Sequence, residues 1–224
     1  KMKTHSLAVM TGAAKNLFGV IPGIMKFEMH ARFKKPEDFF SMVIDLDEQL
    51  AKSHNVIHIC DGIMGMEGDG PSGGIPKKAG VLLMSRNPFN LDCVSARIMR
   101  LDDRVRFISL AAERGLCPKV FDKISIIGSR PEEIECGSFA LPDAAKGKKF
   151  DLIPPFLQPR PVIDGKVCRG CGMCVKSCPQ HTISVKNGKA KINHDRCIRC
   201  YCCQELCTFR AVKIKKSFIY RLVE

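Results

Sequence analysis

The sequence CRGCGMCVKSCP at residues 168–179 shares its cysteine pattern with CIRCYCCQELCT at residues 197–208. Both stretches have the spacing C-x2-C-x2-C-x3-C, and Cys168 and Cys197 begin them 29 residues apart. This spacing is typical of [4Fe-4S] cluster binding, because one tight loop can wrap three corners of a cubane with thiolates while the fourth thiolate comes from elsewhere. The two stretches therefore predict two [4Fe-4S] clusters.

A disulfide framework or a structural zinc site would be the alternative use of so many cysteines. Zinc sites commonly show paired C-x2-C knuckles well apart, whereas here two four-cysteine runs repeat, so cluster binding is favoured. The repeat also continues beyond the cysteines. Residues 181–185 and 210–214 predict two short strands, and Asn187-Gly188 between alternating residues predicts a hairpin turn.

Residues 162–224 resemble the bacterial-type two-cluster ferredoxins in their cysteine pattern, their internal repeat and Pro179. In that family the fourth cysteine of each run binds the other cluster. The resemblance implies one cluster on Cys168, Cys171, Cys174 and Cys207, and a second on Cys178, Cys197, Cys200 and Cys203. Thr208 departs from the pattern, since the family usually has a second proline there. Cys202 is an additional cysteine, which we interpret as a spare thiol.

The composition favours a reducing compartment, because the chain has 13 cysteines without a tidy extracellular pairing pattern. We therefore expect a cytoplasmic protein. No run of eighteen or more apolar residues occurs, so no membrane span is expected. The chain opens at Lys1 without leader character, and we expect that an N-terminal segment precedes it in the full protein.

The formal charge is +13. Eight thiolates and two oxidised cubane cores would together contribute about −4, which leaves roughly +9. Residues 162–224 hold thirteen Lys and Arg against four acidic residues. Because no nucleic-acid motif accompanies this charge, we expect no nucleic-acid partner. Solubility explains the charge best, and an acidic redox partner protein is a further use for it.

Residues 1–130 alternate helical and strand patterns, which predicts an α/β domain ahead of the smaller α+β ferredoxin-like domain. Residues 131–161 lack periodicity and carry Pro142, Pro154, Pro155, Pro159 and Pro161, which predicts a linker or wrapping arm. Helices are expected from Pro36, at 88–100 and at 102–114, and core strands at 55–60, 79–84 and 123–128.

Polar and glycine-rich segments lie between these elements. Residues 61–71 form a glycine-rich loop directly after a predicted strand, where ligands bind in open α/β sheets. The candidates for binding a ligand or a metal are Lys3, His5, Lys15, Asn16, Lys26, His30, Asp61, Glu67 and Asp69. The acidic residues could instead cap and tie the glycine turns, and Lys26 with His30 could be a solvated helical pair. No catalytic residue can be named.

The same segments resemble the family called domain of unknown function 362, in which a two-cluster ferredoxin segment often follows. The matching residues are 1–5, 15–19, 21–23, Lys26 with His30, Asp61-Gly62 and 66–71. The resemblance spans nearly the whole chain and implies a substantial segment, with further strands, ahead of Lys1. It implies an architecture more than a reaction.

Three hypotheses follow. The leading one is an iron-sulfur electron-transfer protein that moves one electron at a time between its clusters and an unknown redox partner, in the cytosol of an anaerobe. A second is a redox enzyme, an oxidoreductase whose active site in the α/β cleft is supplied with electrons by the clusters. A third is a subunit or maturation factor of a larger redox complex.

Overall fold

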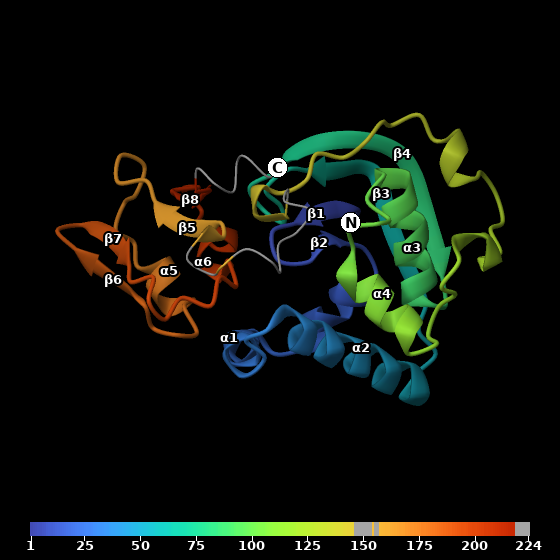
Figure 1. Cartoon of the computed structure of the whole chain (residues 1–224), viewed down its shortest axis with the longest axis horizontal. Coiled ribbons are helices and arrows are strands. Elements are labelled where there is room, and N and C mark those ends of the chain that lie inside the picture. Colours follow the sequence, from blue (N-terminus) through green and yellow to red (C-terminus); the bar gives the residue numbers. More distant parts are fainter. Residues whose placement is uncertain (146–153, 155–156, 218–224) are drawn as a thin grey trace.

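The computed structural model describes residues 1–145, 154 and 157–217. Its first part is a mixed α/β unit built on a four-stranded sheet with the strand order β2-β1-β3-β4 (Figure 1). The strands are β1 (Lys3–His5), β2 (Val9–Thr11), β3 (His58–Glu67) and β4 (Ile75–Ser85). β1 is antiparallel to β2 and parallel to β3, while β3 and β4 form an antiparallel hairpin.

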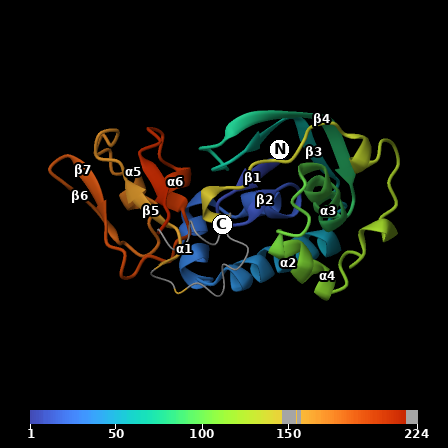
Figure 2. The same ribbon diagram turned by 45° about the horizontal axis from the view of Figure 1, so that its top comes forward.

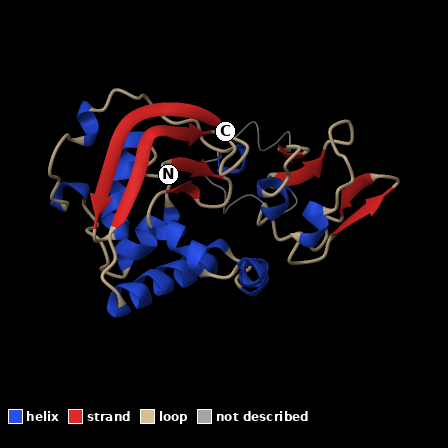
Figure 3. Ribbon diagram, turned by 180° about the vertical axis from the view of Figure 1, so that it is seen from behind, coloured by secondary structure: helices blue, strands red, loops and turns tan. Residues whose placement is uncertain are grey.

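The β3–β4 hairpin is long and curved, and it bends around the first half of the molecule (Figures 1 and 3). Its register shifts between Gly62 and Met64, where Ala79 and Gly80 stand opposite the single residue Ile63. Gly80 has a φ of 73°, the conformation that a glycine bulge needs. Such a bulge bends a strand and increases its twist, which accounts for the curvature here.

Four helices belong to residues 1–145, and the third of them packs against the concave side of the hairpin (Figure 1). They are α1 (Gly23–Arg32), α2 (Pro36–Ser53), α3 (Pro88–Met99) and α4 (Arg106–Glu113), with 3-10 turns η1 (Ala14–Val20), η2 (Phe121–Lys123), η3 (Pro131–Glu133) and η4 (Asp143–Ala145). Helix α2 begins at Pro36 as predicted, and α3 begins where the Asn87 side chain accepts hydrogen bonds from two backbone N–H groups. The helices expected at 88–100 and 102–114 are confirmed, the second being shorter.

Two strand predictions are wrong. Residues 123–128 form no strand, and Ile127 is fully exposed. The strand expected at 55–60 begins at His58 and continues to Glu67, through the segment expected to be a loop. It is also buried on one face only, since His58 and Cys60 point inward while Ile59 is 68% exposed. An antiparallel hairpin needs only one covered face, so its apolar residues do not all enter the core.

The cysteine-rich part, residues 160–217, is an internal repeat with an offset of 29 throughout. Its first half holds β5 (Arg160–Ile163), α5 (Met173–Lys176) and β6 (Ile183–Lys186); its second holds β7 (Lys189–Ile192), α6 (Cys202–Glu205) and β8 (Val212–Lys215). The halves exchange strands, because β5 pairs with β8 and β6 with β7. The predicted hairpin is confirmed: Asn187 and Gly188 have φ values of 51° and 70°, as a type I′ turn requires.

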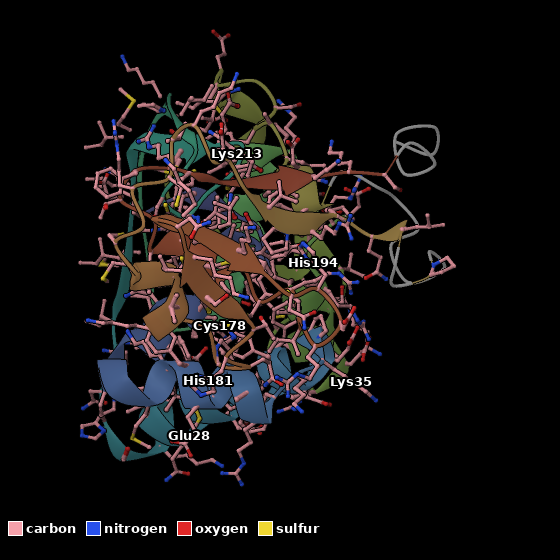
Figure 4. All side chains as sticks on the ribbon, turned by 90° about the vertical axis from the view of Figure 1, so that its left-hand side faces the viewer. Glu28, Lys35, Cys178, His181, His194 and Lys213 are labelled. Atoms are coloured by element: carbon pink, nitrogen blue, oxygen red, sulfur yellow. The ribbon has the colours of Figure 1, made fainter. Side chains whose placement is uncertain are left out.

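The two parts touch through α6, which lies beside β1 and β2 in both Figure 1 and Figure 2. The Ser6 hydroxyl donates to the Gln204 side-chain oxygen over 3.1 Å. In Figure 4, which views the molecule from the side of the cysteine-rich part, α1 with Glu28 lies below Cys178 and His181. Within the described ranges, no helix has the length and apolar character to cross a membrane.

Two buried carboxyl groups lie inside the first part. Asp92 of α3 is fully buried and accepts hydrogen bonds from the backbone N–H groups of Ala13 and Ala14. Asp47 of α2 is 2% exposed, and neither of its oxygens has a hydrogen-bond partner among the described residues. Burial raises the pKa of Asp47 to about 8, with a further contribution from the charge of Asp92, and burial raises the pKa of Asp92 to about 7.

Asp47 therefore makes stability depend on pH. The folded protein keeps a proton on Asp47 that the unfolded chain loses above the ordinary Asp pKa of about 4, so the free energy of unfolding falls as pH rises from about 4 to 8. Asp47→Asn should raise the thermal midpoint of the anaerobic protein more at pH 8 than at pH 5.5. The exposed Asp122→Asn should shift both midpoints equally, and a similar uniform shift for Asp47→Asn would contradict the prediction.

Candidate metal centres and the adjoining cleft

Eight of the nine cysteines in the cysteine-rich part surround two small cavities. The first cavity is lined by Cys168, Cys171, Cys174 and Cys207, and the second by Cys178, Cys197, Cys200 and Cys203. Each cavity thus receives three cysteines from one run and the last cysteine of the other run. The strand exchange brings this about, because the segment after each short helix returns to the opposite half.

Backbone N–H groups point at several of the sulfur atoms. Cys178 accepts from Thr182 N–H at 3.3 Å, and Cys207 accepts from Ala211 N–H at 3.2 Å, which are equivalent bonds in the two halves. Cys168 accepts from the N–H groups of Gly170 and Ala190, and these bonds lower the pKa of the Cys168 thiol. Hydrogen bonds to sulfur favour the thiolate that iron binds.

The loops around the sulfurs have the same backbone conformation in both halves. Positive φ values recur at positions 170 and 199, 172 and 201, and 181 and 210. A Cβ on Gly170 would lie 2.3 Å from the Gly188 carbonyl oxygen, so the first loop touches the hairpin turn where only glycine fits. Nowhere in residues 1–145, 154 and 157–217 do three His, Cys, Asp or Glu side chains converge on a single ion. A cubane instead needs its four thiolates apart, one at each iron, and the two cysteine sets fit that requirement.

A polar cleft of about 450 Å³ opens on the other side of α6. Six of the nine candidate residues line it together: Lys3, His5, Lys15, Asn16, Lys26 and His30. They come from β1, from η1 and from α1, which the fold gathers around one end of the small strands. Cys202, Glu205 and Leu206 close the cleft from the cysteine-rich part.

His5 has a defined tautomer in this cleft. Its Nδ1 accepts hydrogen bonds from the backbone N–H groups of Leu7 at 3.0 Å and Ala8 at 3.3 Å, so the ring proton must be on Nε2. His5 is 4% exposed, and Nε2 has no partner among the described residues. Burial, assisted by the charge of Lys15, holds the pKa of His5 well below its ordinary value. His5 therefore remains a neutral donor.

Phe18 lies between the cations of the cleft. The ammonium groups of Lys15 and Lys26 lie 5.6 Å and 5.8 Å from its ring centre, and His30 contacts its edge. His30 also stacks on Phe39 with a centroid distance of 4.4 Å. Burial lowers the pKa of His30 to about 4, and burial also lowers the pKa of Lys15. The cleft is thus basic and partly shielded from water.

Comparison with known proteins agrees with this division of the chain. Residues 1–97 match the family described as domain of unknown function 362, and residues 160–208 match the family described as 4Fe-4S dicluster domain. The chain carries a 4Fe-4S dicluster domain. Both resemblances found from the sequence are confirmed, and this domain is of the ferredoxin type. A domain of this kind supports [4Fe-4S] cluster binding.

Three curated proteins are similar to the chain. The thylakoid-associated protein sll1697 of Synechocystis is 34% identical over 154 residues, covering 68% of this chain and 47% of that protein. A ferredoxin of Pyrobaculum islandicum is 33% identical over 54 residues, covering 24% and 50%. The DNA-directed RNA polymerase subunit Rpo3 of Methanosarcina acetivorans is 34% identical over 68 residues, covering 28% and 26%. The chain spans half or less of each relative, and no solved structure matches it.

The three acidic candidates do not line the cleft. Asp61 lies within β3 and forms an ion pair with Lys1. Glu67, the last residue of β3, forms an ion pair with Lys77 and accepts from the Ala140 N–H, and Asp69 accepts from the Asp143 N–H. These carboxylates tie the hairpin to neighbouring segments, and the structure does not bring them together with the six candidates that line the cleft.

The glycine-rich stretch after β3 has a structural role that its sequence did not reveal. A Cβ on Gly70 would lie 2.0 Å from the Thr4 carbonyl oxygen, so the stretch presses against the backbone of β1. The Thr4 hydroxyl donates to the Gly68 carbonyl over 2.7 Å, and the Ser6 N–H donates to the Gly70 carbonyl. The glycines permit close approach to a strand, where the sequence suggested a ligand.

Thr11, which lines the cleft, and Asp92, which supports it through η1, were not among the candidates from the sequence. The Asp92 carboxylate accepts hydrogen bonds from the N–H groups of Ala13 and Ala14 at the start of η1, and this turn places Lys15 and Asn16 in the cleft. Thr11, at the end of β2, lines the cleft with a buried hydroxyl. Neither is part of a motif, and only an isolated acidic residue inside an apolar helix pattern could have drawn attention to Asp92.

Cys202 lies where the dicluster domain meets the cleft. Its neighbours Cys200 and Cys203 line the second cavity, whereas Cys202 lines the polar cleft. This placement outside both cysteine sets agrees with its interpretation as a spare thiol.

Proposed function

We propose that this chain transfers single electrons through two [4Fe-4S] clusters, one on each of the two cysteine sets. The observation that carries the proposal is the pair of cavities, each with four cysteine side chains drawn from both runs. Each cluster, when bound, supplies a one-electron couple. The chain holds it with thiolates, directs N–H groups at the sulfurs and shields the centre from water.

Cysteines of both sets, Cys174 of the first and Cys203 of the second among them, belong to one buried cluster, which supports electron exchange between the two centres. Burial raises the pKa of the Cys203 thiol, and neighbouring thiolates, Cys174 of the other set among them, raise it further. Lys176, Lys186 and Lys213 lie on the exposed surface of the dicluster domain. Such charges favour the reduced clusters and offer an acidic redox partner a docking surface.

Reconstitution with iron and sulfide under anaerobic conditions tests the proposal. We expect about eight irons and eight sulfides per chain, and an EPR spectrum of two interacting reduced cubanes after treatment with dithionite. An iron content that stays at about four, or no cubane signal on reduction, would refute the two-cluster function. Zinc bound in place of iron after purification without oxygen would favour a structural site.

A further inference from the structure

We infer that the polar cleft beside α6 binds an oxyanion group, a carboxylate or a phosphate, of a small molecule. We call it the anion cleft. Four lysines line it: Lys1, which pairs with Asp61, and Lys3, Lys15 and Lys26. His5 and Thr11 line it with buried polar atoms that have no partner among the described residues. The inference goes beyond electron transfer, because the residues that recognise the ligand belong to the first part of the chain and would bind an anion whatever the clusters do.

Charge is the first argument. Lys1 forms an ion pair with Asp61, but within the described residues none of the other three lysines of the cleft, Lys3, Lys15 and Lys26, forms an ion pair. Glu205 is the one acidic side chain among the residues that line the anion cleft. Three ammonium groups therefore face one carboxylate, in a recess where burial strengthens electrostatic interactions. An anion would relieve the mutual repulsion of the lysines.

Unpartnered buried donors are the second and independent argument. The Nε2–H of His5 and the hydroxyl of Thr11 are both buried, with side chains 4% and 7% exposed, and neither has a hydrogen-bond partner among the described residues. Leaving such groups unpaired costs the folded protein their desolvation penalty. Both line the same cleft as the lysines. An oxyanion accepts from donors of these kinds at once.

The chemistry of the cleft disfavours other ligands. A metal cation would meet four lysines, and Asp61, Glu67 and Asp69 lie outside the cleft with partners of their own. An aromatic or aliphatic group could contact Phe18, Phe27 and Leu206 along the walls, so a ligand with both an oxyanion and a small apolar body fits best.

Binding should be measured by isothermal titration calorimetry on the anaerobic, fully reconstituted protein at low ionic strength. The probes are inorganic phosphate and succinate, each titrated separately. We expect saturable binding of at least one probe with a Kd on the order of 1 mM, a free energy well within what so few atoms can supply. Phosphate alone would identify a phosphate site, succinate alone a carboxylate site, and both together a general oxyanion site.

Substitutions of cleft residues test whether the anion binds in the cleft. Lys15→Gln should weaken binding at least about 10-fold, and Thr11→Val, which keeps the shape of the side chain, about 3- to 10-fold. Lys52→Gln is the matched control, because Lys52 is an exposed lysine in the last turn of α2, outside the cleft. Lys26→Gln serves as a second cleft variant if Lys15→Gln fails to fold.

The inference is overturned if neither probe binds with a Kd below about 20 mM, a level that corresponds to non-specific attraction. It is equally overturned if the cleft variants bind as tightly as the unaltered protein, or if Lys52→Gln weakens binding as much as Lys15→Gln. Iron content and EPR of each variant separate this result from the proposed electron transfer, because loss of anion binding with intact clusters concerns the anion cleft alone.

Discussion

The double variant Cys168→Ala/Cys178→Ala is expected to lose both clusters, although both substitutions lie in the first cysteine run. Cys168 lines the first cavity and Cys178 lines the second, so each cluster loses one thiolate. Iron should fall from about eight per chain to well below four. If each run instead served its own cluster, the same variant would damage one cluster and keep about four irons.

The variant Cys178→Ala/Cys197→Ala is the complementary test, because it removes one cysteine from each run but both from the same cavity. Both residues line the second cavity, so the first cluster should survive with about four irons and a single non-interacting cubane EPR signal. Ligation within each run predicts loss of both clusters here. A three-iron remnant counts as damage, since the fourth iron has no thiolate. Cys202→Ala should keep all eight irons, because Cys202 lines neither cavity.

Gly12→Ala is expected to destabilise the first part by about 2–4 kcal/mol. A Cβ at position 12 would lie 2.0 Å from the Asp92 carboxylate oxygen that accepts from the Ala13 N–H. Asp92 is fully buried and cannot turn to solvent, so the methyl group must break this hydrogen bond or displace η1. The displaced turn carries Lys15, and anion binding should weaken as well.

Gly19→Ala is the matched control in the same segment. A Cβ there has no heavy atom within 4 Å, and the residue lies inside η1, so the substitution should change stability by less than about 0.5 kcal/mol. Denaturant titrations of the anaerobic protein provide the comparison. Equal stabilities of the two variants would mean that Asp92 does not press against Gly12 as the structure shows.

Much of the fold was accessible from local patterns. Helix α2 begins at Pro36 because proline and acidic residues suit a helix N-terminus, and the β6–β7 turn forms at Asn187-Gly188 because both residues accept a positive φ. Local rules failed at residues 123–128 and 61–67. Residues 61–67 extend β3 because they pair with β4 and, at Met66, with β1, whereas residues 123–128 form no strand. Neither outcome has a signature within the segment itself.

The candidate site was likewise only partly accessible from the sequence. Six of its residues were chosen from polar segments of the sequence, and the fold brings them into one cleft. The acidic candidates were chosen by the same reasoning. However, β3 continues past Asp61 to Glu67, and both carboxylates form ion pairs with lysines, Lys1 and Lys77 respectively. Thr11 and Asp92 were missed because an isolated polar residue gains a role only from burial.

By itself, the sequence determined the cluster chemistry and the repeat of this protein, because thiolate spacing within a loop is a local property of the chain. The resemblance to ferredoxins implied which cysteines belong together, but only tertiary structure brings them to one cavity and makes α6 separate the second cavity from a basic cleft. These relations depend on strand exchange between the two halves and on the contact of α6 with β1. Both join residues far apart in the chain, whose packing energy no short stretch of sequence contains.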